Sequence, residues 1–355
     1  CPIVAVTGSD GKTTTTTLIA KMLEAAGRTV HLGGNIGAAL LPQLENVKPD
    51  DIAVAELSSF QLISMRRSPQ VAVVTNVTPT PLDHHKDMQE YIDAKRNILL
   101  WQNPPCRAVL GYENEISRAM QADCKGDQVW FTRLHETDNG AFLRAADDTL
   151  CYADHGEITP VLPRADVKLR GLHNVENLLA AIAAVWGLVP VEAMRRVGAT
   201  FTGVEHRIEP VRNLDGVQYY NDSIATSPTR TIAGLRSFDQ KLILIAGGYD
   251  KKISYAPLAP ELLAHVKVLV LMGATGPVIE REVRALPDFA ASGMVILHAE
   301  DMQQAVELAR SAARPGDIVS LSPASASFDR YPNFEARGRE YKRIVNALPE
   351  KEPTA

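Results

Sequence analysis

A glycine- and threonine-rich stretch, VTGSDGKTTTTT, at residues 6 to 17 limits the possible folds of this chain more than any other part of the sequence. A short apolar run at residues 3 to 6 leads into it, as expected of a strand. After it, residues 18 to 23 repeat their apolar side chains with the spacing of a helix. A strand, a glycine turn and a helix in this order begin a parallel α/β sheet. The stretch therefore predicts an α/β fold whose first loop lies at a helix N-terminus.

The same stretch has the residue types that bind nucleotide phosphates. Gly8 and Gly11 allow a tight turn that points backbone N–H groups at phosphate oxygens, and Lys12 adds a positive charge. The hydroxyl of Thr13 can reach Mg²⁺. The standard phosphate loop has a glycine six positions before its lysine, where this chain has Val6. We predict a phosphate-binding loop of non-standard spacing, and an ordinary glycine turn is the alternative.

Length and composition set the broad class. A chain of 355 residues exceeds one ordinary core, so two domains are expected. The hydrophobic content of 45% and the charged content of 22% are typical of globular proteins, and a net charge of −5 gives no sign of a nucleic-acid or membrane partner. Four cysteines without metal-binding spacing indicate free thiols. No apolar run approaches the ~18 residues of a membrane span, and we expect a cytoplasmic monomer.

In the first half of the chain, expected strands alternate with expected helices, which predicts a doubly wound parallel sheet covered on both faces. The expected strands are Ile3–Val6, Thr29–Leu32, Ile52–Glu56, Val71–Thr75 and Ala108–Gly111. The expected helices are Thr13–Ala26, Met88–Gln102 and Val175–Trp186. Residues 128 to 162 have short alternating runs, which predict a small antiparallel excursion.

A second unit begins after the stretch FTGVEHRIEPV, residues 201 to 211. Its expected strands are Lys241–Ala246, Lys267–Met272, Met294–His298 and Asp317–Leu321, with helical stretches between them. They predict a smaller, Rossmann-like α/β domain. We therefore expect a first domain over residues 1–205 and a second over residues 206–355.

Polar side chains follow several of the expected strands, at the positions where open α/β sheets bind ligands. In AELSSFQL, Glu56 ends a strand and Ser58 follows, so a carboxylate there can hold Mg²⁺ beside the phosphate loop; a helix-capping glutamate is the alternative. The stretch TNVTPTPLDHH, residues 75 to 85, follows the next strand. In YIDAKRNIL, Lys95 lies on an amphipathic helix, where its spacing alone predicts a solvated lysine.

Taken together, these stretches resemble the Mur ligase superfamily, whose members join an amino acid to a carboxylate through an acyl phosphate made with ATP. The phosphate loop is similar to the family's T-G-[TS]-N-G-K-[TS], with Asp10 in place of the asparagine. Further family motifs follow in order: AELSSFQL, GLHNVENLLAA, GVEHRIE, YYNDSIATSPTRT and AGGYDK. The stretch LSPASASFDRYPNFEARG is similar to the closing motif of the members that add D-glutamate. The resemblance runs from residue 1 to about 345.

The resemblance implies that the first domain binds ATP and the second the incoming amino acid. The substrates would be ATP, D-glutamate and UDP-N-acetylmuramoyl-L-alanine, in the synthesis of peptidoglycan precursors. The phosphates would be held by Gly8, Ser9, Asp10, Gly11, Lys12, Thr13 and Thr14. Asn174 and Asn177 would read adenine, with a helix N-cap and a surface amide as the alternatives. Arg207 and Asp222 would also hold the nucleotide.

Two Mg²⁺ ions are also implied, with Thr13, Glu56 and Lys95 as the metal-binding residues. Lys95 matches a family lysine that reacts with CO₂ to form a carbamate, which then binds the second ion. Together with Lys12, Glu56 and Lys95 would be the catalytic residues. The residues implied for substrate binding are Asn35, Ser58, Lys251, Ser327 and Phe334, of which the last three would receive D-glutamate. A turn asparagine, a solvated lysine and a core phenylalanine are the alternatives at 35, 251 and 334.

Three departures from the family pattern bear on activity. Because the chain begins directly in a strand, the UDP-sugar-binding N-terminal domain of the family is expected to be missing. Pro81 stands where the family has a metal-binding histidine, although His84 or His85 is a possible replacement. Ile224 replaces a lysine and removes a cation near the phosphates. Two other functions stay open: a folate-type glutamate ligase, and a nucleotide-binding remnant that no longer ligates.

Overall fold

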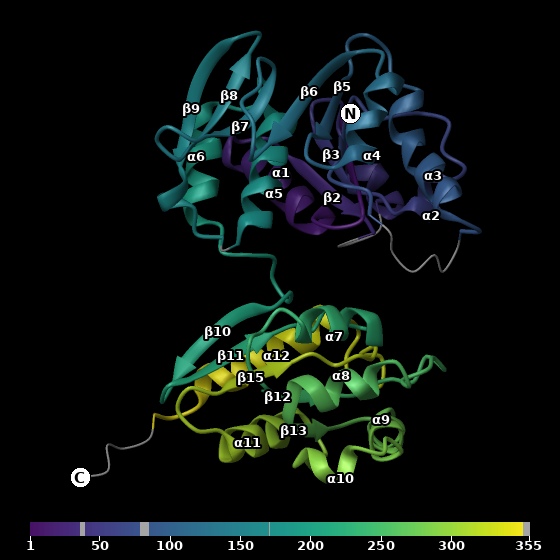
Figure 1. Cartoon of the computed structure of the whole chain (residues 1–355), viewed down its shortest axis with the longest axis vertical. Helices are drawn as coiled ribbons and strands as arrows, with labels where there is room; N and C mark the ends of the chain where they lie inside the picture. Colours follow the sequence, from purple (N-terminus) through teal and green to yellow (C-terminus); the bar gives the residue numbers. More distant parts are fainter. Residues whose placement is uncertain (36–39, 79–84, 170, 351–355) are drawn as a thin grey trace. The chain divides into compact units, whose positions relative to one another are not determined.

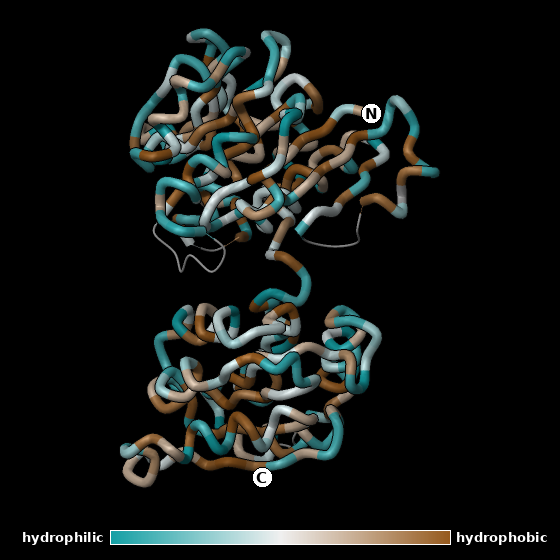
Figure 2. Tube along the Cα trace, turned by 90° about the vertical axis from the view of Figure 1, so that its right-hand side faces the viewer, coloured by the Kyte–Doolittle hydropathy of each residue, from teal (hydrophilic) through white to brown (hydrophobic). Residues whose placement is uncertain are grey.

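The computed structural model describes residues 1–35, 40–78, 85–169 and 171–350 (Figure 1). The chain divides into two compact units, Cys1–Gly203 and Val204–Ala355, which are described separately below. Within the described ranges, no helix has the length and apolar character needed to cross a membrane. In each unit the apolar segments lie mainly inside, and the polar segments lie mainly at the periphery (Figure 2).

The first unit is built on one sheet, which has nine strands among the described residues in the order β2-β3-β1-β4-β5-β6-β7-β8-β9. Strands β2 to β7 pair in parallel along this order, and β7, β8 and β9 pair antiparallel. The strands are β1 (Ile3–Thr7), β2 (Val30–Gly34), β3 (Ile52–Glu56), β4 (Val71–Val74), β5 (Arg107–Gly111), β6 (Asp127–Thr132), β7 (Gly140–Arg144), β8 (Thr149–Asp154) and β9 (Glu157–Pro163).

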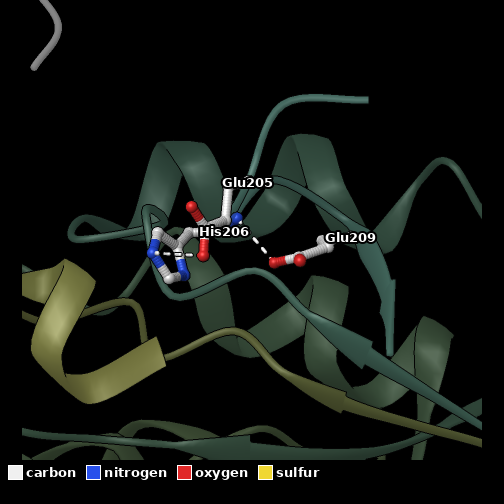
Figure 3. Close-up of side chains that lie close together, drawn as sticks. All are labelled: Glu205, His206 and Glu209. Atoms are coloured by element: carbon white, nitrogen blue, oxygen red, sulfur yellow. Dashed lines mark hydrogen bonds and ion pairs between the residues drawn. The ribbon is translucent and has the colours of Figure 1, made fainter. Parts of the chain in front are cut away.

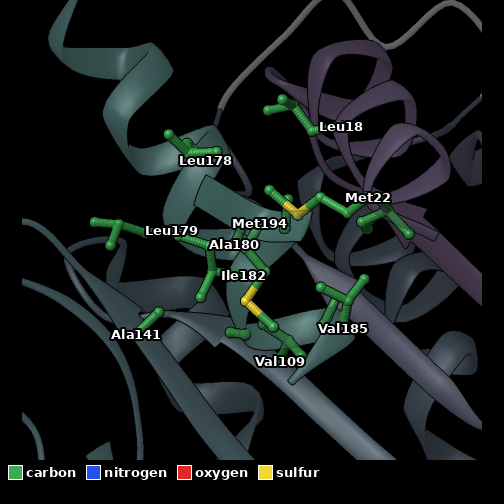
Figure 4. Packing of buried hydrophobic residues seen from close by; sticks show 14 of the residues in the cluster. Leu18, Met22, Val109, Ala141, Leu178, Leu179, Ala180, Ile182, Val185 and Met194 are labelled. Carbon is green, nitrogen blue, oxygen red and sulfur yellow. The ribbon is translucent and has the colours of Figure 1, made fainter. Parts of the chain in front are cut away.

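Helices cover both faces of this sheet because successive side chains of a buried strand point to opposite faces. Val4 and Val6 pack with α1, α5 and α6, whereas Ala5 packs with α2 and α3. Figure 4 shows the first of these layers, where Leu18 of α1 and Leu178 of α5 belong to one cluster. The helices are α1 (Lys12–Ala25), α2 (Ser59–Leu62), α3 (Met88–Leu100), α4 (Glu115–Ala119), α5 (Leu172–Val185) and α6 (Val191–Thr200), with the short 3₁₀ helices Leu41–Asn46, Met120–Asp123 and Arg164–Asp166.

The predicted antiparallel excursion over residues 128 to 162 is wrong in its first part. Strand β6 pairs in parallel with β5, with Arg107 opposite Asp127, and β7 pairs in parallel with β6. Only β8 and β9 form an antiparallel extension. The alternating pattern was ambiguous because a strand that extends a parallel sheet can also have one apolar face. Pairing with β5 covers a sheet edge that would otherwise be exposed.

The second unit has a six-stranded sheet, as far as the chain is described, with the order β10-β11-β15-β12-β13-β14. Only β10 and β11 pair antiparallel. This hairpin was not among the predicted strands. The strands are β10 (Glu209–Leu214), β11 (Val217–Asn221), β12 (Leu242–Ala246), β13 (Val266–Leu271), β14 (Val295–His298) and β15 (Ile318–Leu321).

Helices also cover the two faces of the second sheet (Figure 1). Residues of α11 and α12 pack on one face with Ile243 and Ile245, and residues of α7, α8 and α9 pack on the other with Leu242 and Leu244. The helices are α7 (Pro228–Leu235), α8 (Leu258–His265), α9 (Gly276–Arg284), α10 (Phe289–Ser292), α11 (Met302–Ala312) and α12 (Phe334–Ala347). The predicted fold class, a doubly wound parallel sheet followed by a smaller Rossmann-like domain, is confirmed.

Candidate active site

The loop between β1 and α1 is tightly enclosed by its neighbours. Gly8 and Gly11 have φ angles of 152° and 78°, which other residues rarely adopt. A Cβ atom on Gly8 would lie 1.8 Å from Thr75 Oγ1, and one on Gly11 would lie 2.2 Å from Asn177 Oδ1. Both positions therefore require glycine, because the backbone has a positive φ there and because the segment after β4 and helix α5 come too close for a side chain.

The segment after β4 holds this loop through hydrogen bonds. The N–H of Ser9 donates to the carbonyl of Asn76 at 2.8 Å, and the N–H of Asp10 donates to Asn76 Oδ1 at 2.9 Å. The hydroxyl of Thr75 donates to the carbonyl of Asp10 at 2.6 Å. The motif TNVT thus shapes the phosphate loop. The position of this motif after a strand predicted the same edge of the sheet, but its contacts with the loop could not be predicted from the sequence.

Lys12 begins α1 and lies over the loop. Its Nζ donates to the carbonyls of Gly8 and Ser9 at 3.0 and 2.8 Å. Thr14 is half-buried in the first turn, where backbone N–H groups have no partner within the helix. An ammonium group, glycine N–H groups and a helix N-terminus together favour an anion at this position.

The hydroxyl of Thr13 and the carboxylate of Glu56 meet at the carboxyl edge of the sheet. Thr13 Oγ1 donates to Glu56 Oε2 at 2.8 Å, and Asn35 Nδ2 donates to Glu56 Oε1 at 3.1 Å. Glu56 is only 2% exposed. Hydroxyl, carboxylate and amide oxygens are the hard ligands that Mg²⁺ prefers, so this donor set fits the ion that the family resemblance implies.

Lys95 is buried, so the solvated lysine predicted from its spacing is wrong. Helix α3 turns this side chain toward β1, and 1% of it is exposed. Its Nζ donates to the carbonyl of Gly8 at 2.9 Å and to Thr7 Oγ1 at 3.4 Å, and it lies 4.6 Å from the ring centroid of Tyr91. Burial, and then the charge of Lys12, lower the pKa of Lys95 to about 7, while Glu56 acts in the opposite direction.

Ser58 and His85 lie beside the start of α2. Ser58 caps this helix: its hydroxyl accepts from the N–H of Gln61, whose side chain accepts from the N–H of Ser58. The cap is thus Ser58, and the alternative of Glu56 as a helix-capping residue is wrong. His85 Nε2 lies 2.8 Å from Ser59 Oγ, and its ring packs edge-on against Tyr91. Pro81 and His84 lie outside the described residues.

Asn174 and Asn177 lie one turn apart near the start of α5. Asn177 Nδ2 donates to Asn174 Oδ1 at 3.0 Å, and Asn177 Oδ1 accepts from Thr15 Oγ1 at 3.4 Å. The helix N-cap is Gly171, and Asn177 is only 7% exposed. The alternatives of an N-cap and a surface amide are therefore wrong. Asn177 instead lies against the loop between β1 and α1 and donates to Asn174, and the predicted contact of the pair with adenine stays a prediction.

Asp222 follows β11 in the second unit and is almost fully buried. It accepts hydrogen bonds from Ser322 Oγ at 2.7 Å and from the N–H of Ile208 at 3.2 Å. Burial raises the pKa of Asp222 to about 7, although these hydrogen bonds and the charge of Arg207 act against the increase. Close by, the carbonyl of Ile224 accepts from Arg230 Nη1 at 3.2 Å, so an arginine lies beside the position where the family has a lysine.

The three residues predicted to receive D-glutamate lie on segments of the second unit that contact one another. Ser327 is buried and belongs to the loop after β15, while Lys251 is exposed in the loop after β12. The two loops are joined by a hydrogen bond from the N–H of Tyr249 to the carbonyl of Ala326. Phe334 begins α12 and is partly buried. Sequence reasoning gave no role to Arg337 in this region, and the only signal for it was its place in the motif NFEARG.

A cluster of Glu205, His206 and Glu209 has metal-ligand atoms within 4.8 Å of one another (Figure 3). Lys342 Nζ already lies 2.6 Å from Glu205 Oε1 and 2.8 Å from Glu209 Oε1. His206 Nδ1 faces the amide Nδ2 of Asn221 at 2.8 Å and so acts as acceptor, which puts the proton of the neutral ring on Nε2. An ammonium group thus compensates the two carboxylates, and the imidazole atom nearest Glu205 is a donor.

Comparison with known proteins follows the same division of the chain. The family described as Mur ligase middle domain matches residues 6–185, and the family described as Mur ligase, glutamate ligase domain matches residues 206–325. UDP-N-acetylmuramoylalanine–D-glutamate ligases are similar along nearly the whole chain. The one from Acetivibrio thermocellus is 52% identical over 98% of this chain and 75% of its own, and the one from Clostridium beijerinckii is 49% identical over 98% and 74%.

Two solved structures support the fold. MurF from Acinetobacter baumannii superimposes with a TM-score of 0.65 at 16% identity, over 96% of this chain and 77% of its own. The murein peptide ligase Mpl from Psychrobacter arcticus has a TM-score of 0.59 at 18% identity, over 98% and 78%. The similarity to the ligases of known sequence extends across both units at about half of all positions. This chain therefore belongs to the Mur ligase family.

Proposed function

We propose that this chain is an ATP-dependent ligase that joins D-glutamate to UDP-N-acetylmuramoyl-L-alanine in peptidoglycan precursor synthesis. Its relatives at 52% and 49% identity carry this name, and the chain spans about three quarters of their length. The observation that carries the chemistry is the convergence of Lys12, the Thr13–Glu56 pair and Lys95 on one phosphate loop.

The first step activates a carboxylate, which is a poor electrophile until it has a leaving group. A carboxylate oxygen of the UDP-linked substrate bonds to the γ-phosphorus of ATP while the bond to the β-phosphate oxygen breaks, giving an acyl phosphate and ADP. Lys12 and the N–H groups of the loop hold the phosphate oxygens, and positioning with charge stabilisation supplies most of the catalysis. Ser9, Asp10 and Thr14 are proposed to contribute to the same cradle.

Thr13 and Glu56 are proposed to hold Mg²⁺, since their oxygens lie 2.8 Å apart at the edge of the phosphate loop. When bound, the ion neutralises phosphate charge. Asn35 orients the Glu56 carboxylate through its amide, so its predicted contact with substrate is secondary to this contact in our proposal.

Lys95 is proposed to act as a carbamate. With a pKa of about 7, roughly half of its amine is neutral at pH 7, and only the neutral form has the lone pair that attacks CO₂. A C–N bond forms, the nitrogen loses a proton, and the ammonium site becomes a carboxylate. This change would place a second carboxylate beside the phosphate loop, as the second Mg²⁺ of the family requires.

In the second step the neutral amine of D-glutamate attacks the acyl phosphate carbon and a C–N bond forms. The C–O bond to phosphate breaks, its electron pair leaves with the phosphate, and the nitrogen releases a proton to solvent. We propose residues 1–205 as the ATP-binding domain and residues 206–355 as the amino-acid-binding domain, in which Lys251, Ser327 and Phe334 hold D-glutamate. The remaining proposed roles are adenine binding by Asn174 and Asn177, nucleotide binding by Arg207 and Asp222, and substrate binding by Ser58. A cytoplasmic monomer remains our proposal.

The test measures phosphate release by the complete gene product when it is supplied with ATP, Mg²⁺, UDP-N-acetylmuramoyl-L-alanine and D-glutamate. We expect release that depends on D-glutamate and that L-glutamate does not replace. Release with a folate and L-glutamate instead would identify the folate-type ligase. ATP binding without release in either mixture would identify the nucleotide-binding remnant, for which Pro81 and Ile224 are the reasons.

A further inference from the structure

Arg337, in α12, has its guanidinium group buried in the interior of the second unit, with 2% of the residue exposed. Nε donates to Ser223 Oγ at 3.0 Å, and Nη2 donates to the carbonyl of Ser223 at 2.9 Å. Nη1 donates to the carbonyls of Ser325 and Ala326, each at 3.0 Å. Within the described parts of the chain, no carboxylate forms an ion pair with this group. Arg337 is thus held by uncharged oxygens of two separate loops.

All three segments that carry the proposed D-glutamate residues lie close to Arg337 or are connected to it by hydrogen bonds. Ser325 and Ala326 directly precede Ser327. A Cβ atom on Gly248, three positions before Lys251, would lie 3.2 Å from Arg337 Nη1, so this backbone passes close to the guanidinium.

The third segment is reached through Ser223, whose hydroxyl also donates to the carbonyl of Phe334 at 2.8 Å. Arg337 therefore hydrogen-bonds to the loop after β15 and connects through Ser223 to the start of α12, while the loop after β12 passes close to its guanidinium. Lysine could not replace it, because a planar guanidinium spans several acceptors in one plane whereas an ammonium is a point charge.

The charge of Arg337 matters as well as its geometry. Burial lowers the pKa of Arg337 to about 10, with Asp329 and then Tyr331 acting in the opposite direction, so the group stays positive at pH 7. A positive charge under a protein surface is less screened than one in water. The loops above it therefore favour a ligand with negative charge.

We propose that Arg337 is a positioning residue for the amino-acid substrate, which sets the relative placement of the segments of Lys251, Ser327 and Phe334 and adds a buried positive charge that selects a dicarboxylate. The inference rests on the proposed ligase function. It assigns to Arg337 no contact with substrate, because its hydrogen bonds are directed at the protein.

The test compares Arg337→Lys and Arg337→Met with the control Arg343→Met, measuring steady-state kinetics in the polypeptide that its gene encodes. Arg343 lies in the same helix, is 64% exposed and pairs only with Glu340 among the described residues. We expect the KM for D-glutamate to rise about 10- to 100-fold in Arg337→Met and less in Arg337→Lys, which keeps the charge. The KM for ATP and the kcat at saturating D-glutamate should change less than about 3-fold. The control should keep all three constants.

Ser223→Ala keeps the proposal testable if the arginine variants do not fold, since it removes one hydroxyl that joins Arg337 to Phe334. Its KM for D-glutamate should rise about 2- to 10-fold. An unchanged KM for D-glutamate in the folded variants, or an equal rise for ATP, overturns the positioning role. Lack of any D-glutamate-dependent phosphate release by the unsubstituted protein overturns the proposed function itself.

Discussion

Lys95 in the first unit and Arg337 in the second are both buried cations under loops that we propose to bind ligands, yet they differ in what they can do. Lys95 has a pKa of about 7 and contacts one carbonyl, one hydroxyl and one aromatic ring. Arg337 has a pKa of about 10 and makes hydrogen bonds to three carbonyls and one hydroxyl. Burial makes the lysine amine available for chemistry, whereas the arginine remains a fixed charge. Burial of a cation therefore predicts reactivity only when the group can lose its proton.

Replacing Lys95 by arginine, the residue type found at position 337, should have the greatest effect on activity. Lys95→Arg keeps a cation but cannot form a carbamate, so we expect kcat to fall by about 10²- to 10⁴-fold, as for loss of a catalytic group. The kcat of Lys95→Ala should fall by a similar factor and should recover in part when a small carboxylic acid is added. The control Lys86→Ala removes an exposed lysine just before the same helix and should keep full activity. Full activity of Lys95→Arg would contradict the carbamate.

A second substitution tests the neighbour that lowers the pKa of Lys95. Lys12→Met should weaken ATP binding about 10- to 100-fold through loss of a charged phosphate contact. It should also raise the pKa of Lys95, because the charge of Lys12 is the second cause of its depression. Calorimetric titration and NMR of labelled lysine measure the two effects. Lys21→Met, on the exposed side of α1, is the matched control, and unchanged ATP affinity in Lys12→Met would remove the loop from the active site.

The rigidity of the phosphate loop can be tested at Gly11, by comparison with Gly27 near the other end of α1. Both have positive φ, 78° and 81°, but only Gly11 would place a Cβ atom against Asn177. Gly27→Ala should lower the free energy of unfolding by about 1 kcal/mol, and Gly11→Ala by about 2–4 kcal/mol, since a clash adds to the backbone strain. Chemical denaturation measures both values. Equal losses would show that Asn177 moves aside freely.

The last prediction concerns the pH dependence of stability. Asp222 and Lys95 both have a pKa of about 7 in the folded protein, but their ionised forms have opposite charges. The pKa of Asp222 is raised in the folded state. Between about pH 4 and 7 the folded unit therefore keeps a proton that the unfolded chain has released. The stability that this proton contributes is lost as pH rises through 7. Lys95 has a lowered pKa, so its contribution increases with pH between about 7 and 10.5.

Asp222→Asn should therefore raise the Tm at pH 8 by about 2–4 °C relative to its effect at pH 5. Asp250→Asn, in the same unit but at a carboxylate whose pKa is lowered by its hydrogen bond to Lys252, should show no such gain at pH 8. Calorimetry at both pH values measures the difference. A gain that is the same at pH 5 and pH 8 would contradict the assigned titration of Asp222.

Much of the fold was predictable because it depends on local periodicity. The apolar run before Gly8 and the helix after it appear as β1 and α1, and the four strands predicted in the second unit are present. Strand partners were harder to predict, because an alternating pattern shows which face is buried but not which edge is paired. The parallel pairing of β6 with β5 and the hairpin of β10 and β11 are examples.

The family and the order of its motifs could be identified without a structure, and glycines, a lysine and hydroxyls at fixed spacing predicted a phosphate-binding loop, because this pattern has few other uses. The environments of the side chains, in contrast, depend on how the elements pack together. The spacing around Lys95 predicts a side chain in solvent, yet packing of its helix against β1 buries the side chain beside Gly8 and lowers its pKa. Arg337 is one residue of a short motif until two distant loops converge on it. Charge state and hydrogen-bond partners depend on neighbours far away in the chain, and these are set only when the sheets assemble.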